Sequence, residues 1–292
     1  MIVATHSGNF HADDVFAVAT LRLALGELEL IRTRDRARYA EADVRVDLGG
    51  RSDPETGDFD HHQKGGAGER ANGVRYASFG LVWREHGASL AGSPEAARAV
   101  DERLVQGIDA NDTGQTIAES LVGGIRAMSV SGLIGAMNPD WDDELTAEQE
   151  DARFADAVAF ATGILQRELA GSAAFQRAQD LVGGAIARAD DPRVVELERN
   201  MPWREAVVTR APEALFVVYP KSDGWALQAV PRELGGFGNR KDLPAAWAGL
   251  TDEALAEVTG VPDARFAHLA GFYAAAGSRE GIMALVERAL AA

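Results

Sequence analysis

The sequence predicts an α/β protein in which a mostly parallel sheet flanked by helices is followed by a smaller α+β domain. In the first half, short apolar runs alternate with longer segments of helical apolar spacing, which is typical of a parallel sheet covered by helices. After Asp190-Asp191-Pro192 the pattern changes to short β-rich runs separated by proline and glycine. The 292 residues are enough for two domains of ordinary size. We therefore expect a division into residues 1–188 and 189–292.

The N-terminal domain opens with expected strands at residues 2–5, 29–33 and 43–47. Between the first two strands, a helix from about Asp14 to Leu25 is apolar on most sides, so we expect it to be buried. Strands joined through a helix run parallel. Active sites of such sheets form beyond the carboxyl ends of the strands, which is where His6 and Asp47 stand.

The remaining elements follow from start signals and apolar spacing. Further helices are expected at residues 78–86, 94–107 and 146–189, the last of them broken near Gly171-Ser172. Ser93 before Pro94 is a helix start signal, and Thr146 with Gln149 forms a capping box. In the C-terminal domain we expect strands at 194–197, 206–209, 215–219 and 225–230, and helices near 252–259 and 279–290.

The amino-acid composition excludes some kinds of site and disfavours some kinds of ligand. There are no cysteines, which excludes disulfides and thiolate metal sites. The net charge of −16 opposes tight non-specific binding of nucleic acid, although divalent ions and local arginines can still admit a nucleic-acid substrate to a cleft. No apolar run reaches the roughly 18 residues that span a bilayer, and the N-terminus lacks the pattern of a secretory signal. We expect a cytoplasmic protein without a membrane partner.

Histidines and carboxylates gather in two short segments. Four of the six histidines lie in 5–14 and 58–63, and a strand-like run ending in Asp47 lies between these segments. Imidazole nitrogen and carboxylate oxygen, collected after apolar strands, are the donors of a dinuclear divalent-metal site. The candidate residues, with a choice open between the last two, are His6, His11, Asp13, Asp47, Asp60, His61, His62 and Asp109 or Asp112, of which Asp112 is favoured.

Each candidate alone has an ordinary structural interpretation. Asp13 could cap the following helix, and Asp47 could be a turn residue before Gly49-Gly50. Their joint occurrence after strands favours metal binding. Without sulfur donors, Mn²⁺ is the leading ion, two ions are expected, and Mg²⁺, Co²⁺ and Zn²⁺ are alternatives. Two ions bridged by an aspartate suit in-line attack on phosphorus.

The residues also carry a family resemblance over nearly the whole chain. Asp60-His61-His62, with the upstream loop and Asp47, resembles the DHH phosphoesterase superfamily. The chain is more closely similar to the Myg (melanocyte proliferating gene) family, for which exonuclease activity is reported in eukaryotic members. The matching stretches are 5–13, 46–50, 59–63, 78–87, 239–244, 247–250, 266–268 and 271–272.

This resemblance implies roles for individual residues. One ion would be held by His6, His11 and Asp47, and the other by Asp13, Asp47, His61 and Asp112. His62 would contact the phosphate. Arg240 and Lys241 resemble a phosphate clamp on the C-terminal domain, with a solvated basic turn as the alternative, and His268 is either a substrate contact or a structural histidine.

The expected function is a Mn²⁺-dependent phosphodiesterase, a 3′–5′ exonuclease-type enzyme acting on RNA or short oligonucleotides. Its catalytic and substrate-binding residues would include His62, Arg240, Lys241 and His268. A small-molecule phosphatase or pyrophosphatase using the same ions is the alternative, and the net charge of −16 favours it. A third interpretation is a metal-stabilised scaffold without turnover. The sequence carries no information on oligomeric state.

Overall fold

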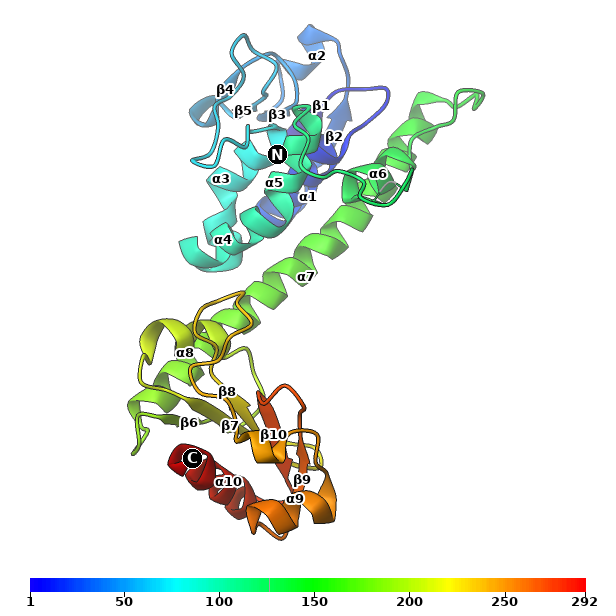
Figure 1. Cartoon of the computed structure of the whole chain (residues 1–292). Coiled ribbons are helices and arrows are strands. Elements are labelled where there is room, and N and C mark those ends of the chain that lie inside the picture. The colour runs from blue at the N-terminus through cyan, green and yellow to red at the C-terminus, as the bar shows by residue number, and fades with distance from the viewer. Residues whose placement is uncertain (126) are drawn as a thin grey trace. The chain divides into compact units, whose positions relative to one another are not determined.

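The computed structural model describes residues 1–125 and 127–292, and these form two compact units, Met1–Ala173 and Ala174–Ala292. The helix α7 (Ala147–Ala187) runs without interruption through the division between them (Figure 1). The domain boundary predicted between residues 188 and 189 falls just after this helix. It stays a prediction. Within the described residues, no helix combines the length and apolar composition needed to cross a membrane.

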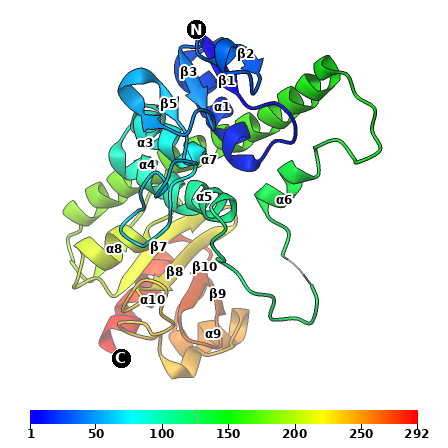
Figure 2. The ribbon, with the colours of Figure 1, turned by 90° about the horizontal axis from the view of Figure 1, so that it is seen from above.

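The N-terminal unit is built on a five-stranded, mostly parallel sheet, as predicted. Its strand order is β2-β1-β3-β5-β4, and only β4 runs antiparallel to its neighbour. Figure 2 shows β1, β2 and β3 side by side with α1 next to them. The strands are β1 (Ile2–Thr5), β2 (Glu29–Arg32), β3 (Val44–Val46), β4 (Ser52–Asp53) and β5 (Asp58–Phe59).

The apolar core of this unit lies between the sheet and its helices. Helix α1 (Ala12–Leu25) is buried along most of its first three turns, as its apolar composition predicts. It packs against α3 (Ser78–Ala91), where Phe16 and Phe79 are in ring contact at 5.3 Å between centroids. The first half of α7 contributes Phe154 and Leu165 to the same core. The shorter elements are α2 (Arg36–Tyr39), the 3-10 turn η1 (Pro54–Thr56) and α6 (Val130–Gly135).

Two helix predictions in this unit need correction. The helix expected at 94–107 is instead α4 (Pro94–Val100), a π-helical segment η2 (Asp101–Val105) and α5 (Gln106–Asp112). The break expected at Gly171-Ser172 is wrong, because α7 continues through it. The Ser172 hydroxyl is buried and donates to the Ala96 carbonyl oxygen at 3.2 Å, so this residue joins α7 to the core rather than ending the helix.

The C-terminal unit has a second five-stranded sheet, in the order β6-β7-β8-β10-β9, with apolar clusters on both faces. One cluster packs against α9 (Asp252–Thr259) and α10 (Arg279–Ala291), and the other against α8 (Arg204–Arg210) and the second half of α7. The strands are β6 (Val194–Glu196), β7 (Phe216–Lys221), β8 (Gly224–Ala229), β9 (Ala264–Ala267) and β10 (Tyr273–Ala276), and a 3-10 turn, η3, covers Ala245–Trp247.

One expected strand of this unit is wrong and two strands are unpredicted. Residues 206–209 form part of helix α8, where Ala206 and Val207 are buried against the sheet. A short apolar run fits either a strand or a buried helix, and here tertiary packing decides for the helix. Strands β9 and β10 are rich in alanine and were not expected, since alanine has low strand propensity.

Candidate metal centre

Parallel strands deliver the candidate residues to one edge of the N-terminal sheet. His6 follows β1, Asp47 follows β3, and Asp60 follows β5. These three strands are mutually parallel neighbours, so their carboxyl ends share an edge. All three side chains are almost fully buried there. The rule that active sites form beyond the carboxyl ends of the strands therefore correctly predicted where His6 and Asp47 lie.

The backbone at Asp47 is in a conformation that L-residues rarely adopt. Its φ angle is 55°, in the left-handed region, and it is one of only two non-glycine residues with positive φ among the described residues. Such a conformation costs on the order of 1 kcal/mol or more and is maintained only where the surroundings fix it. Here the Ser78 hydroxyl fixes the side chain, donating to Asp47 Oδ1 at 3.0 Å. Asp47 is thus held with its carboxylate toward the cluster.

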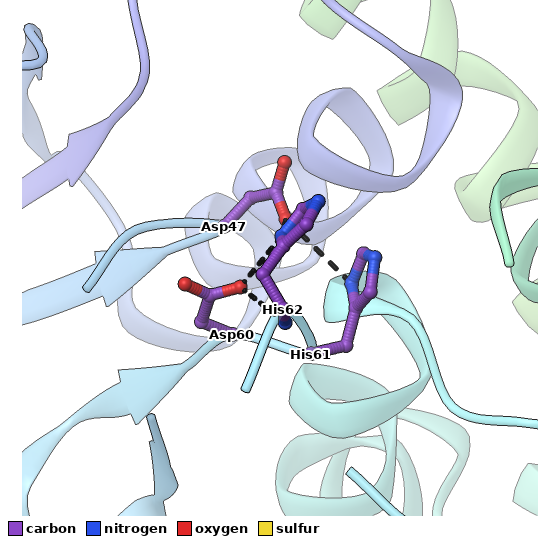
Figure 3. Close-up of side chains that lie close together, drawn as sticks. All are labelled: Asp47, Asp60, His61 and His62. Atoms are coloured by element: carbon purple, nitrogen blue, oxygen red, sulfur yellow. Dashed lines mark hydrogen bonds and ion pairs between the residues drawn. The ribbon is translucent and has the colours of Figure 1, made fainter. Parts of the chain in front are cut away.

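Asp47 lies at the meeting point of two groups of donor atoms. His62 Nδ1 is 3.2 Å and His61 Nδ1 3.6 Å from Asp47 Oδ1. His62 Nδ1 is also 2.9 Å from Asp60 Oδ1. Figure 3 shows these four side chains converging from the ends of β3 and β5. The rings of His61 and His62 are stacked, with 4.2 Å between their centroids.

The other carboxylate oxygen of Asp47 faces the first loop. His6 Nε2 lies 3.3 Å from Asp47 Oδ2, and His6, His11 and Asp47 have donor atoms mutually within 4.8 Å. A third set with the same spacing is His11, Asp13 and Asp112. Asp112 is also 3.0 Å from His61 Nε2. The structure therefore brings together all six residues for which metal binding was predicted, namely His6, His11, Asp13, Asp47, His61 and Asp112.

Two buried carboxylates at the cluster lack hydrogen bonds to some of their oxygens, and the nearest opposite charges are histidines: His6 Nε2 lies 3.4 Å from Asp14 Oδ2, and His61 Nδ1 lies 3.9 Å from Asp13 Oδ2. Both oxygens of Asp13 and Oδ2 of Asp14 are buried without a hydrogen-bond partner within the described chain. Asp14 uses its other oxygen to accept from the His11 backbone N–H at 2.9 Å. An unpaired buried carboxylate is costly unless it is protonated or coordinates a cation. This set of nitrogen and oxygen donor atoms could hold a divalent metal ion.

The pKa values reflect the same crowding of charge. Burial, together with the negative charges of Asp47 and Asp112, raises the pKa of Asp13 well above its usual range. Burial also raises the pKa of Asp14 to about 7, although His6 opposes the rise. Burial alone would raise the pKa of Asp47, but hydrogen bonds with His6 and His62 keep that pKa below its ordinary value. A metal ion binding at this cluster would therefore have to compete with protons.

A cavity of about 320 Å³ gives access to the cluster. The exposed guanidinium of Arg34, just beyond β2, borders it, with Nη2 3.2 Å from His6 Nδ1 and Nε donating to the Ser7 carbonyl oxygen. His62 borders the same cavity, and its side chain is 63% exposed. The full lining is His6, His11, Arg34, Asp47, Leu48, Gly49, Gly50, Asp60 and His62.

Comparison with known proteins identifies the family. Residues 2–290 match the family model MYG1_exonuc, described as an uncharacterised protein family (UPF0160). The chain belongs to this family. The human MYG1 exonuclease is 32% identical over 99% of this chain and 85% of its own length. The MYG1 protein YER156C of Saccharomyces cerevisiae is 31% identical over 99% and 95%, and the MYG1 protein of Chlamydia trachomatis is 31% identical over 95% and 92%.

In this MYG1-family chain, the two aspartates between which the choice was left open lie in different surroundings, and metal binding by Asp112 stays a prediction. Asp112, at the end of α5, faces His61 and His11. Asp109 points elsewhere: it accepts from the Gly80 backbone N–H at 3.0 Å and lies 2.9 Å from Arg70 Nη1. Arg70 in turn is held by Asp101 through two hydrogen bonds. Asp109 thus belongs to a separate network that joins α3 to α5.

The expected phosphate clamp has internal partners in the C-terminal unit. The Arg240 guanidinium donates to the carbonyl oxygens of Val208, Ala211 and Ala214, closing the end of α8. Lys241 Nζ lies 3.4 Å from the Leu290 carbonyl oxygen near the end of α10. These contacts agree with structural roles, and phosphate binding by Arg240 and Lys241 stays a prediction.

His268 lies on the surface of the same unit. Its Nδ1 accepts from the Ala270 backbone N–H, and its ring packs on Phe272 at 4.4 Å between centroids. The residue is half-buried. A substrate contact by His268 likewise stays a prediction.

Sequence reasoning missed two residues that shape the site. Arg34 stands just beyond the carboxyl end of a parallel strand, like His6 and Asp47, so the same rule would have found it. Ser78 begins α3, and its hydroxyl contacts both Asp47 and His61 Nδ1. No local signal marks Ser78, because helix-start serines are common.

Proposed function

We propose that this protein is a divalent-metal-dependent phosphodiesterase that removes nucleotides from RNA or short oligonucleotides, in the 3′–5′ direction and with two Mn²⁺ ions. The observation that carries the proposal is Asp47, whose two carboxylate oxygens face two groups of histidine and aspartate donors. A carboxylate in this position can bridge two ions. The human relative named as an exonuclease supports phosphodiesters as the substrate class.

We propose two positions for the ions, based on which donor atoms lie close together. His6, His11 and Asp47 would hold one, and Asp13, Asp47, His61 and Asp112 the other. Ions bound there supply positive charge for the phosphoryl oxygens and acidify the attacking water. Both effects are needed at phosphorus, where the transition state is rich in negative charge.

The side chains around the cavity would orient the substrate. His62 Nδ1 is held by Asp60, which leaves Nε2 as the ring nitrogen available to a phosphoryl oxygen. Arg34 borders the same cavity, and its planar guanidinium fits two phosphate oxygens at once. Ser78 keeps the carboxylate of Asp47 in position and thereby acts through it.

Purified protein incubated with end-labelled RNA and Mn²⁺ tests the proposal. We expect release of mononucleotides that EDTA abolishes. Asp47→Asn and His61→Gln should each reduce this release by at least about 10- to 100-fold, the range typical even of residues that only orient a metal ligand. Asp156→Asn is the matched control, because Asp156 is exposed on α7 and contacts no other described side chain through a hydrogen bond or ion pair. RNA that stays intact with Mn²⁺ would refute nuclease action.

A small-molecule phosphatase or pyrophosphatase is the second candidate. The net charge of −16 favours it, since a long polyanion is repelled where a small phosphorylated compound needs only a local cation such as Arg34. Release of inorganic phosphate from pyrophosphate or nucleoside phosphates, with RNA left intact, would select this function.

A further inference from the structure

A second cavity borders the histidine pair of residues 61 and 62. Its volume is about 310 Å³, and His61 borders it, whereas His62 borders the cavity of the metal cluster. The two rings are stacked at 4.2 Å between centroids, so each cavity is bordered by one ring of the same pair. The rest of this second lining comes from the loop of residues 65–69, from Arg75 and Tyr76, and from Thr113.

The loop that lines this cavity has an open, glycine-rich backbone. Gly65, Gly66 and Gly68 all have positive φ, and a Cβ on any of them would meet nothing within 4 Å. Among the described residues, the backbone N–H groups of Gly65, Ala67 and Gly68 donate no hydrogen bond to the protein. Uncovered N–H groups on a glycine loop are suited to anions, which can approach such a backbone closely.

Arg75 adds a cation to the same cavity. Its guanidinium is exposed, and its one hydrogen bond among the described residues is a long one, 3.5 Å from Nη1 to the Thr113 carbonyl oxygen. Its backbone is fixed, because its N–H donates to Gln115 Oε1 at 2.8 Å. A fixed backbone with a lightly held guanidinium leaves the side chain available for a ligand. Glu69, also exposed, is the opposing charge at this cavity.

We propose that this second cavity binds a neighbouring phosphate of the substrate, so that the substrate is a chain with successive phosphodiesters rather than a compound with one phosphate. The inference rests on the proposed function, since it places the scissile phosphate at the cavity of the metal cluster. The Gly65–Gly68 loop would receive the neighbouring phosphate through backbone N–H groups, and Arg75 would pair with it. A single-phosphate substrate would leave this subsite unused.

Binding of a fluorescent pentaribonucleotide, followed by anisotropy with Ca²⁺ and with EDTA, tests the subsite apart from cleavage. We expect Arg75→Gln to weaken binding about 10-fold and to reduce the slope of log affinity against log salt by about 0.7, the value for one phosphate contact on a single strand. Arg75→Lys should retain most of the affinity, and Glu69→Gln should tighten binding. Arg38→Gln, on the exposed face of α2, is the control. Hydrolysis of bis-p-nitrophenyl phosphate should be unchanged in Arg75→Gln.

The outcomes separate the subsite from the proposed function. If the wild type binds the oligonucleotide through Arg75 but hydrolyses none, the proposed function fails and the anion subsite stands. If Arg75→Gln binds and cleaves the oligonucleotide like the wild type, the subsite is refuted while the phosphodiesterase stands. Absence of any binding by the wild type also overturns the subsite.

Discussion

A methyl group at Gly80 would collide with the buried network that joins α3 to α5. An ideal Cβ at this position lies 1.9 Å from Asp109 Oδ2 and 2.8 Å from Arg70 Nη2. Asp109 is fully buried and accepts from the Gly80 backbone N–H. Gly80→Ala therefore forces the Asp109 carboxylate, or the whole of α5, to move.

Two opposing contributions decide how much Gly80→Ala changes the free energy of unfolding. Alanine is favoured over glycine inside a helix by about 1 kcal/mol. Displacing Asp109 disrupts its ion pair with Arg70, and breaking a buried pair costs about 3–5 kcal/mol. The second contribution is larger, so we expect Gly80→Ala to lower the free energy of unfolding by about 2–4 kcal/mol. Because Asp112 lies on the same helix three residues later, Mn²⁺ affinity should fall as well.

Urea unfolding followed by circular dichroism, with a Mn²⁺ titration by calorimetry, measures both effects. Gly163→Ala is the matched control, because Gly163 is exposed within α7 and a Cβ there meets nothing within 4 Å. That substitution should stabilise the protein by about 0.5–1 kcal/mol through helix propensity alone. Equal, stabilising effects of the two alanines would refute the argument that the Arg70–Asp109 network holds α5 in place.

Three further expectations follow from individual contacts. Ser78→Ala removes the hydroxyl that orients Asp47 and should weaken Mn²⁺ binding about 10- to 100-fold in calorimetry. Burial raises the pKa of Asp109 to about 7, although Arg70 opposes the rise. Below that pH the folded protein therefore holds a proton on Asp109 that the unfolded chain has released. The stability that this proton contributes is lost as the pH rises through 7. Between pH 6 and 8 the metal-free wild type should therefore lose about 1 kcal/mol more unfolding free energy than Asp109→Asn. Arg240→Met removes three hydrogen bonds to backbone carbonyls and should lower stability by about 2–4 kcal/mol.

Each of these has an outcome that contradicts it. Unchanged Mn²⁺ affinity in Ser78→Ala would mean that Asp47 is oriented without the hydroxyl. Parallel pH profiles of the wild type and Asp109→Asn would show that Asp109 stays ionised throughout. If Arg240→Met keeps full stability and instead raises KM for the oligonucleotide, Arg240 is a phosphate ligand and its contacts with α8 are secondary.

Periodic, local features of the chain were readable from the sequence. The strand beginning at Ile2 and the buried helix through Phe16 follow from apolar patterns that a few neighbouring residues define. The strand predicted at Ala206–Thr209 was wrong, because four apolar or β-branched residues fit a strand as well as a buried helix turn. Its state was settled by packing on a sheet whose strands lie elsewhere in the chain.

The same distinction runs through the candidate site. The sequence by itself determined which donor atoms are available, because the chain has no cysteine and His6 and Asp47 each stand at the end of an apolar run. Only the tertiary structure decided that Asp112 faces His61 while Asp109 pairs with Arg70, and that the donors of Arg240 meet the carbonyls closing α8. The residue types, and the order of strands and helices along the chain, can be read from local segments of the sequence. Which side chains meet depends on the path of the backbone between them, and that path is fixed by contacts spread over the whole fold.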